Sequence, residues 1–470
     1  MKIEKHKERY KYKKVLFVEM KYPKKIKVPK EIEKDNSFFI HFRKQLPLDL
    51  LFPATILEKK GIKVSIIDLN VDSYGTLLEK AKYFKPDLVL LSTSYIGSWQ
   101  CPLPPALLEK NSKKIREAFK CKFGVFGPHP TSLPEFILEK SHADFLIIGE
   151  PENPITNICK NGFKKTNNVA YFDKKKRIQM KKMFDPFNME KMPVPDYGLI
   201  DLKKYEAAII QSSRGCPGAC LFCNKTMYGP GFRQRKIDDV IKEIEILKDF
   251  GFKSFYFQDL EFLFNEKRVE EFCKKVIKKR LNIKWSCTAR VNSVKSLKVY
   301  KLMKNAGCDT INFGLESAAN SILATSGKGI TMQDVEESMT LCSRSGVKGA
   351  YNIIFGLPGE NKKTMKETRK FIEKNYNKEN IFIDRGFRII YFPGTKLFDI
   401  ALKQGKIKMK TIFDDIYLKS GTINTSFKSK KEFDNAFQFM RIKLFAFKKV
   451  KKIKSRIGAL LDKGKIKKEN

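Results

Sequence analysis

Short apolar runs alternate with amphipathic stretches over the first 150 residues of the chain. The runs at Lys14–Val18, Val64–Asp68 and Asp87–Ser92 are mostly apolar, which is typical of buried strands. The apolar residues of Leu48–Lys60 recur at helical spacing and stop at Gly61, so this stretch predicts a helix. The other expected elements are helices over Thr76–Phe84 and Pro104–Lys120 and strands over Lys122–Phe126 and Asp144–Ile148. This alternation predicts a doubly wound parallel sheet that binds ligands at the carboxyl ends of its strands.

A second β–α series fills the middle of the chain. Its expected strands are Ala207–Gln211, Lys253–Gln258, Ile283–Cys287, Thr310–Gly314, Gly349–Phe355 and Ile383–Tyr391. Its expected helices are Asp238–Phe250, Glu266–Arg280, Val294–Ala306, Met332–Ser345 and Lys363–Tyr376. About six such units predict a partial (β/α)6 barrel of the TIM type, and parallel barrels place their sites at the carboxyl ends of the strands.

Changes in composition divide the chain into four parts. We expect the first α/β domain over residues 1–150, a connector over 151–205, the barrel over 206–395 and a basic, helical extension over 396–470. The connector is dense in proline, as in Met192–Tyr197, so it predicts an extended strap and not a packed element.

The charge of the chain is strongly positive. Its 470 residues include 94 lysines and arginines and 52 aspartates and glutamates, for a formal net charge of +42. Such a charge favours phosphate binding, but the lysines are scattered through every segment, which is typical of solvated helix faces. No specific nucleic-acid partner is therefore expected. Without an apolar run of about 18 residues or the apolar core of a signal peptide, the sequence predicts a cytoplasmic protein with reduced cysteines.

The tail from Arg441 to Lys468 departs from this scattered pattern. Lysines crowd there beside apolar residues, as around Phe447 and Ile453. This mixture suits a basic amphipathic helix at an anionic membrane surface, which would make the protein membrane-peripheral. It equally suits a terminal helix that packs on its own domain.

Three cysteines lie within eight residues, at Cys216, Cys220 and Cys223. A C-x3-C-x2-C loop between a strand and a helix brings three thiolates to one face, where they hold three corners of a [4Fe–4S] cube and leave the fourth iron open. Zinc is the alternative metal. It normally takes a fourth protein ligand, and no second Cys or His pair follows at zinc-finger spacing.

The cysteine loop and the motifs that follow it resemble the radical S-adenosylmethionine (radical SAM) enzymes over roughly residues 205–400. The resemblance lies in an ordered series of short segments, and all but Met303–Cys308 lie at the end of an expected strand or in the turn after it. These segments are Phe257–Phe262, Ala289–Asn292, Met303–Cys308, Phe313–Ser317, Phe355–Glu360 and Phe392–Thr395. The resemblance implies that S-adenosylmethionine (SAM) chelates the open iron through its amino and carboxylate groups.

The resemblance also implies which residues contact SAM. Asp259 matches an acid that contacts the amino group, and Arg290 is placed to anchor the carboxylate. Glu316 matches a residue near the ribose, and the turn from Gly356 to Glu360 lies against the nucleoside.

Each of these residues has a structural alternative. The family's usual second acid is replaced here by Leu260, which weakens the match at Asp259. Asp259 and Glu316 would otherwise be exposed strand-end acids, Arg290 a salt-bridge partner, and Gly356–Gly359 a tight turn. Four cysteines in apolar segments are interpreted as buried core thiols: Cys273, Cys287, Cys308 and Cys342.

The first 150 residues resemble the cobalamin-binding domain that precedes the radical domain in one class of radical SAM enzymes. The candidate cobalamin-binding residues are Ser92, Ser94, Gly127 and Gly149, within Ser92–Ser94, Gly127–Thr131 and Gly149–Glu152. Two further matching pieces are Leu46–Leu50 and Asp68.

The first domain departs from the cobalamin-binding pattern at two places. Glu19–Pro23 stands where an Asp-x-His-x-x-Gly element supplies an axial His in other cobalamin proteins, and Phe126 replaces the first of two glycines. We therefore expect cobalamin without an axial His from this position. His129 is interpreted as a turn residue. The alternative is a vestigial α/β domain that holds no corrin.

The resemblance implies an enzyme that generates a 5′-deoxyadenosyl radical with electrons from a reductant such as ferredoxin or flavodoxin. Methylation of an unactivated carbon of a small-molecule or lipid substrate is the leading interpretation, and cobalamin-dependent rearrangement or ring closure is the second. An RNA-modifying or RNA-binding protein is a third interpretation, and a non-catalytic maturation partner is a fourth. The first-domain cysteines Cys101, Cys121 and Cys159 do not resemble the arrangement found in RNA methylthiotransferases.

Overall fold

The computed structural model describes residues 10–21, 44–94, 105–183, 185–229, 231–405, 407–409, 427 and 431–438. The chain forms two compact units that interleave along the sequence. Unit 1 comprises Met1–Pro217, Cys223–Leu260 and Tyr391–Ile416, and unit 2 comprises Gly218–Phe222, Glu261–Ile390 and Tyr417–Asn470. The domain bounds expected from composition stay predictions. The basic tail from Arg441 to Lys468 lies outside the described residues.

Unit 1 contains a seven-stranded sheet with the order β2-β1-β3-β4-β5-β6-β7. Its strands are β1 (Lys14–Glu19), β2 (Lys63–Asp68), β3 (Leu88–Ser92), β4 (Lys122–Phe126), β5 (Phe145–Ile147), β6 (Val169–Phe172) and β7 (Ile178–Met180). The first five pair in parallel, as the alternation predicts. The last two add an antiparallel hairpin at the edge, which the sequence pattern did not predict.

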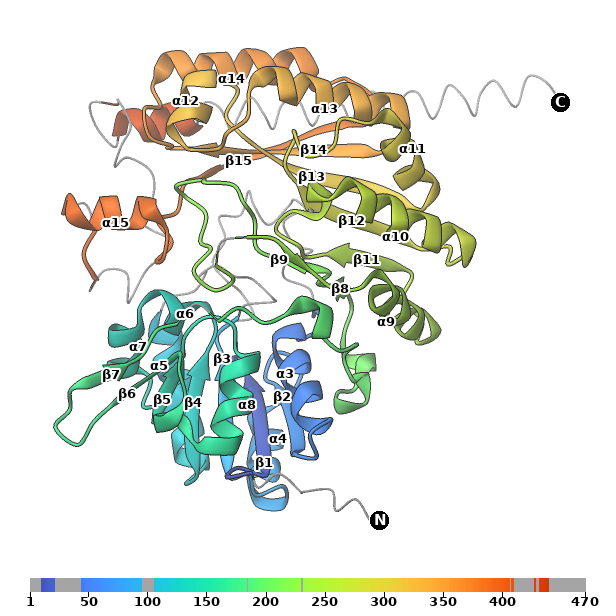
Figure 1. Cartoon of the computed structure of the whole chain (residues 1–470). Coiled ribbons are helices and arrows are strands. Elements are labelled where there is room, and N and C mark those ends of the chain that lie inside the picture. The colour runs from blue at the N-terminus through green and yellow to red at the C-terminus, as the bar shows by residue number, and fades with distance from the viewer. Residues whose placement is uncertain are drawn as a thin grey trace. The chain divides into compact units, whose positions relative to one another are not determined.

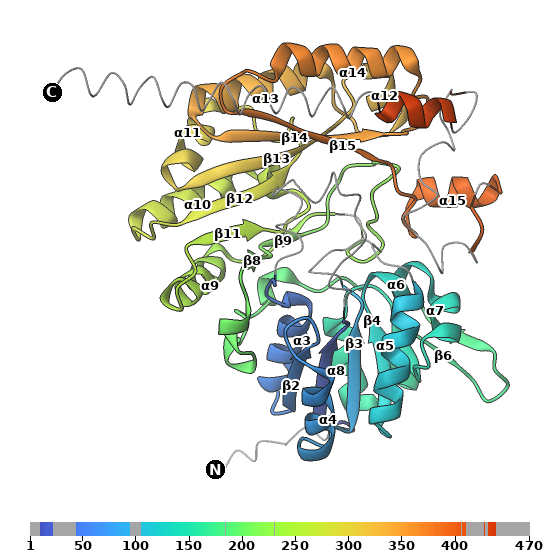
Figure 2. The same cartoon turned by 180° about the vertical axis from the view of Figure 1, so that it is seen from behind.

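Helices cover both faces of this sheet (Figures 1 and 2). They are α3 (Leu48–Glu58), α4 (Tyr74–Tyr83), α5 (Pro105–Ala118), α6 (Pro128–Ser132), α7 (Pro134–Lys140) and α8 (Glu152–Asn161). Helix α3 packs beside α8, and α4 beside α5. The central strands are apolar and bury residues such as Val18 and Leu91 completely, so the helices shield the sheet from water on both sides.

One expectation for this region is wrong, and one is refined. The segment after Gly127 is the five-residue helix α6, so the turn that contains His129 is helical and buried. The strap expected over 151–205 begins instead with the amphipathic helix α8, whose Ile155 and Ile158 are buried, and continues into the β6–β7 hairpin. Of the five prolines in the segment, Pro151 and Pro154 lie at its start, and the other three lie in its last part.

The rest of unit 1 carries the chain into the second β–α series. Its strands are β8 (Ala208–Ile210), β9 (Ser213–Arg214), β10 (Arg233–Gln234) and β11 (Ser254–Phe257). Strands β8 and β11 are parallel neighbours, and β9 and β10 form a short antiparallel pair. The helical elements are α9 (Ile237–Asp249), α15 (Lys396–Lys403) and the 3-10 turns η2 (Phe163–Lys165), η3 (Met189–Lys191), η4 (Tyr197–Leu199) and η5 (Leu202–Lys204).

Unit 2 continues the series with four more strands. They are β12 (Lys284–Ala289), β13 (Cys308–Glu316), β14 (Lys348–Phe355) and β15 (Ile381–Arg388), each parallel to the next. Its helices are η6 (Phe262–Phe264), α10 (Glu266–Lys278), α11 (Leu297–Asn305), α12 (Asn320–Thr325), α13 (Met332–Ser345) and α14 (Lys362–Asn375). Helix α11 packs beside both α10 and α13 (Figure 1). All six predicted strands of the second series are therefore present, and each has a parallel neighbour.

The core of unit 2 is aromatic and contains buried thiols. Phe262, Phe272 and Trp285 form a cluster with ring centroids 5.4–5.9 Å apart. The four cysteines interpreted as core thiols are at most 1% exposed, which confirms that interpretation. Among the described residues, no helix has the length and apolar character needed to cross a membrane.

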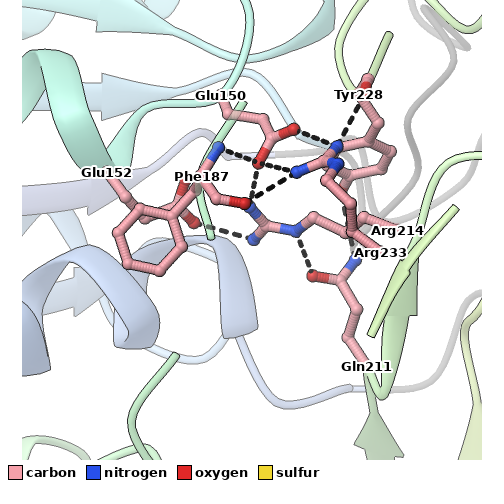
Figure 3. Close-up of polar contacts among 7 residues, drawn as sticks. All are labelled: Glu150, Glu152, Phe187, Gln211, Arg214, Tyr228 and Arg233. Carbon is pink, nitrogen blue, oxygen red and sulfur yellow. Dashed lines mark hydrogen bonds and ion pairs between the residues drawn. The ribbon is translucent and has the colours of Figure 1, made fainter. Parts of the chain in front are cut away.

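A network of buried charges in unit 1 joins the end of β5 to the residues that precede the cysteine loop (Figure 3). Arg214 donates to Glu150 at 2.9 Å, to Glu152 at 2.7 Å and to Gln211 at 2.8 Å. Arg233 donates to the other oxygen of Glu150 at 2.5 Å. The Arg214 side chain is only 1% exposed, so both carboxylates are needed to offset the cost of burying its charge.

Replacing Arg214 with Met should destabilise the protein strongly. Met fills most of the volume but leaves Glu152 buried without a cation, and loss of one partner of a buried pair costs about 3–5 kcal/mol. Urea denaturation measures the change in the free energy of unfolding. The matched control is Arg177→Met, which removes a pair with Asp173 from an arginine that is 68% exposed. The control should change stability little, and equal losses in both variants would contradict the assigned role of Arg214.

Candidate functional site

The cysteine loop follows directly from β9. Gly215 enters it with φ +83°, and a Cβ there would lie 1.8 Å from the carbonyl oxygen of Gly231, so only glycine fits. Cys216, Cys220 and Cys223 are all half-buried, and none forms a disulfide. Three soft thiols from one short loop are the donor set that an iron–sulfur cluster takes. No group of three His, Cys, Asp or Glu side chains is arranged to hold a metal among the residues that the structure describes, so ligation by these thiols stays a prediction.

Two cations of unit 2 lie close to Cys220. The Arg290 guanidinium lies 3.8 Å from the Cys220 sulfur and also donates to the carbonyl oxygens of Lys328 and Gly329. Burial lowers the pKa of Lys328, but attraction to Glu316 and to the Cys220 thiol outweighs this effect and raises the pKa above its ordinary value. The sulfur of Cys220 therefore lies in a positive environment.

The structure brings Glu316 and Lys328 together in a buried ion pair of 2.8 Å. Glu316 ends β13 with φ +65°, a conformation that is strained for a residue with a side chain. The prediction of an exposed strand-end acid is wrong, because Glu316 is only 5% exposed. Its part in ribose binding stays a prediction.

Asp259 is also buried, at 1% exposure, and not an exposed acid. Its carboxylate accepts hydrogen bonds from the Ser212 amide at 2.7 Å, the Ser212 hydroxyl at 2.5 Å and the Ser213 hydroxyl at 2.6 Å. These serines immediately precede Arg214, so the carboxylate orients the strand that leads into the cysteine loop. Its contact with an amino group stays a prediction.

The turn after β14 is stabilised by its own glutamate. Glu360 accepts a hydrogen bond from the Gly356 amide at 2.5 Å, and Gly356 and Gly359 have φ of +95° and +84°. The other carboxyl oxygen of Glu360 is buried without a hydrogen-bond partner. Thr325 donates to the Pro358 carbonyl at 2.8 Å and so ties this turn to the end of α12.

The four candidate cobalamin residues lie after neighbouring strands of unit 1. The Ser94 amide donates to the Ser92 hydroxyl at 3.1 Å after β3. Thr131 links the two glycines, since its hydroxyl donates to the Gly127 carbonyl at 2.7 Å and accepts from the Gly149 amide at 3.0 Å. The structure therefore brings all four residues to one edge of the sheet.

Gly127 and Ser94 pack closely together at this edge. Gly127 has φ +110°, and a Cβ there would lie 2.7 Å from the Thr93 hydroxyl and 3.2 Å from the Ser94 amide. The Ser94 hydroxyl is buried beside the Asp49 carboxylate, and the contact between them opposes the rise in the pKa of Asp49 that burial causes. These features fit a polar ligand at the carboxyl edge of the sheet.

Sequence reasoning missed several charged residues at these edges. Glu261 is fully buried and accepts from the Arg290 amide at 2.7 Å, and burial raises its pKa to about 7. Burial likewise raises the pKa of Asp49, in α3, to about 6. Asp49 could have been identified from the sequence, because it is an acid within the mostly apolar helix Leu48–Glu58. Nothing in the sequence marks Lys328 as the partner of Glu316.

Glu360 should make stability pH-dependent. Burial raises its pKa from 4.5 to about 8, so between these values the folded chain binds a proton that the unfolded chain has released. Stability therefore falls as the pH rises from about 4.5 to 8, by up to about 1.4 kcal/mol per pH unit. Glu360→Gln keeps an acceptor for Gly356 but cannot ionise, so its unfolding free energy should fall less steeply over this range. Chemical denaturation at several pH values measures the slope.

The matched control for this measurement is Glu367→Gln, on the exposed face of α14. Because that carboxyl is in water, the control should keep the slope of the unmodified protein. A slope in Glu360→Gln equal to that of the control would show that Glu360 does not titrate in this range.

Two family models match the two β–α series. The B12 binding domain matches residues 44–158, and the radical SAM superfamily matches residues 210–372. The first range contains the four candidate cobalamin residues, and the second contains the cysteine loop and the acids that follow it.

Individual relatives agree with this pairing of domains. The chain is 29% identical over 381 residues to an uncharacterized methyltransferase of Pyrococcus horikoshii, covering 76% of this chain and 78% of the relative. It is 28% identical over 338 residues to the anaerobic magnesium-protoporphyrin IX monomethyl ester cyclase of Cereibacter sphaeroides, covering 66% of this chain but only 54% of the cyclase.

A solved structure has the same fold. The cobalamin-dependent SAM radical enzyme OxsB, with aqua-cobalamin and SAM bound, superposes with a TM-score of 0.73 at 19% identity and covers 91% of this chain and 66% of its own. This likeness confirms the fold class, and the two family models confirm the resemblance and the cofactors that it implies. The chain therefore carries a B12-binding domain and, after it, a radical SAM domain, the two domains that the resemblance implies.

Proposed function

We propose that the protein is a cobalamin-dependent radical SAM methyltransferase that acts on an unactivated carbon of a small-molecule or lipid substrate. The observation that carries this proposal is the succession of a B12-binding region and a radical SAM region along one chain. Similarity to a methyltransferase over 78% of that relative's length favours methyl transfer.

The three cysteines of the loop are the proposed cluster ligands. Together, a [4Fe–4S] cluster, SAM and cobalamin supply radical formation and methyl transfer when bound. Cys216, Cys220 and Cys223 are half-buried, which is compatible with a cluster that an external reductant must reach. Ferredoxin and flavodoxin are reductants of a suitable kind. The acids and glycines predicted to contact SAM are Asp259, Glu316, Gly356 and Glu360.

The proposed corrin site is the carboxyl edge of the first sheet. Ser92 and Ser94 would contact its polar groups, and Gly127 and Gly149 have the positive φ that lets the backbone turn at this edge. The segment Glu19–Pro23, which begins at the last residue of β1, contains no His, and its Glu19 and Met20 are both buried. Cobalamin is therefore proposed to bind without a His ligand from this segment.

Ring closure is the second candidate function, because the chain is also similar to a cyclase. The two functions differ in their product. Transfer of a labelled methyl group from SAM to the substrate supports methylation, and loss of substrate hydrogen without label uptake supports cyclisation.

RNA methylthiolation is less well supported by the structure. Cys159 is completely buried in α8, and burial raises its thiol pKa to about 12. Burial also raises the pKa of Cys121, and Cys101 lies outside the described residues. Complete burial within a helix leaves Cys159 poorly placed to ligate a cluster.

Reconstitution with iron and sulfide without oxygen tests the cluster ligands. The unmodified protein should bind about four iron atoms per chain and give the paramagnetic signal of a reduced [4Fe–4S] cluster. Alanine at Cys216, Cys220 or Cys223 should abolish the signal, because three thiolates must hold the cube. Cys121→Ala is the control and should keep it. A signal that survives all three loop substitutions would overturn the assignment.

Gly127→Ala should weaken cobalamin retention. The added methyl group would lie 2.7 Å from the Thr93 hydroxyl, so the backbone at the carboxyl edge must shift. Gly61→Ala is the matched control, since Gly61 also has a positive φ, at +78°, but nothing lies within 4 Å of its Cβ position. Equilibrium dialysis should show at least about a tenfold weaker affinity in Gly127→Ala, a cost of about 1.4 kcal/mol. Equal retention by both variants would contradict this site.

A further inference from the structure

One charged side chain of unit 2 contacts a predicted cluster ligand directly. Arg290 follows β12, and one nitrogen of its guanidinium lies 3.8 Å from the Cys220 sulfur. Another nitrogen donates to the carbonyl oxygens of Lys328 and Gly329. The planar guanidinium presents several donors in a fixed fork, so one side chain can serve the sulfur and both carbonyls at once.

The surrounding backbone restricts Arg290 to this position. Its own amide donates to the buried Glu261 carboxylate at 2.7 Å. The segment that supplies the carbonyl oxygens packs on the cysteine loop, because the Leu221 amide donates to the Ser326 carbonyl at 3.0 Å. Gly327 has φ +67°, and a Cβ there would lie 2.8 Å from the Ala219 carbonyl oxygen, so the two segments approach closely. Arg290 therefore belongs to a packed support behind Cys220.

We propose that Arg290 is a positioning residue that donates a hydrogen bond to the Cys220 thiolate and raises the reduction potential of the bound cluster. This inference rests on the proposed cluster site. Reduction adds one negative charge to the cluster and its thiolates. A nearby cation and a hydrogen bond to sulfur stabilise that charge, so they favour the reduced form.

Lys328, the neighbouring cation, is less able to stabilise the reduced cluster. Lys328 is buried, but its ammonium pairs with Glu316 at 2.8 Å, and this pairing offsets its charge. The Arg290 guanidinium donates to neutral carbonyls and to sulfur, while the nearby Glu261 carboxylate accepts from the Arg290 backbone amide. The positive charge of Arg290 is therefore directed at the cysteine ligand.

This role differs from the carboxylate anchor that the sequence predicts for Arg290. A guanidinium that binds the SAM carboxylate affects the affinity for SAM. A guanidinium that binds the thiolate affects the potential of the cluster even when SAM is absent. The two roles therefore have separate readouts.

The test is a redox titration of the reconstituted full chain without SAM, followed by electron paramagnetic resonance. The variants are Arg290→Gln and Arg290→Lys, and the control is Arg344→Gln, which removes the same charge from the exposed last turn of α13. Arg290→Gln should lower the midpoint potential by about 59 mV, a tenfold change for a one-electron couple. Arg344→Gln should leave the potential unchanged.

Arg290→Lys provides a second measurement. Lysine keeps the charge but lacks the fork that reaches the sulfur and the carbonyls together, so the potential should fall by a smaller amount. If Arg290→Gln retains no iron, the potential of Arg290→Lys decides the question. The proposal is overturned if the cluster-loaded Arg290 variants keep the potential of the control, and a loss of SAM affinity alone would instead support the carboxylate anchor. Absence of a cluster in the unmodified protein would refute the proposed function itself. Failure of the proposed function can therefore be distinguished from failure of the proposal for Arg290.

Discussion

The need to pair buried charges is the constraint on which the candidate corrin site and the cysteine loop both depend. A charge removed from water is tolerated only when a partner within the chain offsets its desolvation. Arg214 meets this need with Glu150 and Glu152, which precede it by more than 60 residues. The pairing therefore joins the end of the first β–α series to the start of the cysteine loop. The ion pair between Arg235 and Glu243, both fully buried, satisfies the same constraint in unit 1.

The direction of the strands then decides where these charges can act. In a parallel sheet all strands end at the same edge, so loops that are distant in sequence become neighbours. Thr131 links the loops after β4 and β5 in this way. Glycines with positive φ, such as Gly127 and Gly356, let the backbone turn sharply at these edges without a side chain in the way.

The comparisons identify the two domains but not the substrate. The cysteine loop lies within the range that the radical SAM model matches. The relatives include a methyltransferase and a cyclase at nearly equal identity, so similarity alone does not choose between the two reactions. The environment of Cys220 is described directly by the structure of this chain, in which Arg290 and Lys328 lie close to the sulfur.

The sequence by itself determined the two β–α series, the cysteine loop and the candidate residues at the strand ends. These features are local. Apolar periodicity, a glycine at the end of a helix and the spacing of a motif each involve only a short stretch of sequence. It could not determine that α8 and the β6–β7 hairpin replace a strap, because proline density outweighed a modest amphipathic pattern. The partners of Glu316, Asp259 and Arg290 were likewise decided only by the tertiary structure. Those pairings depend on which segments meet when the strands assemble, and on the need of each buried charge for a partner. The spacing of residues along the chain does not specify either of these.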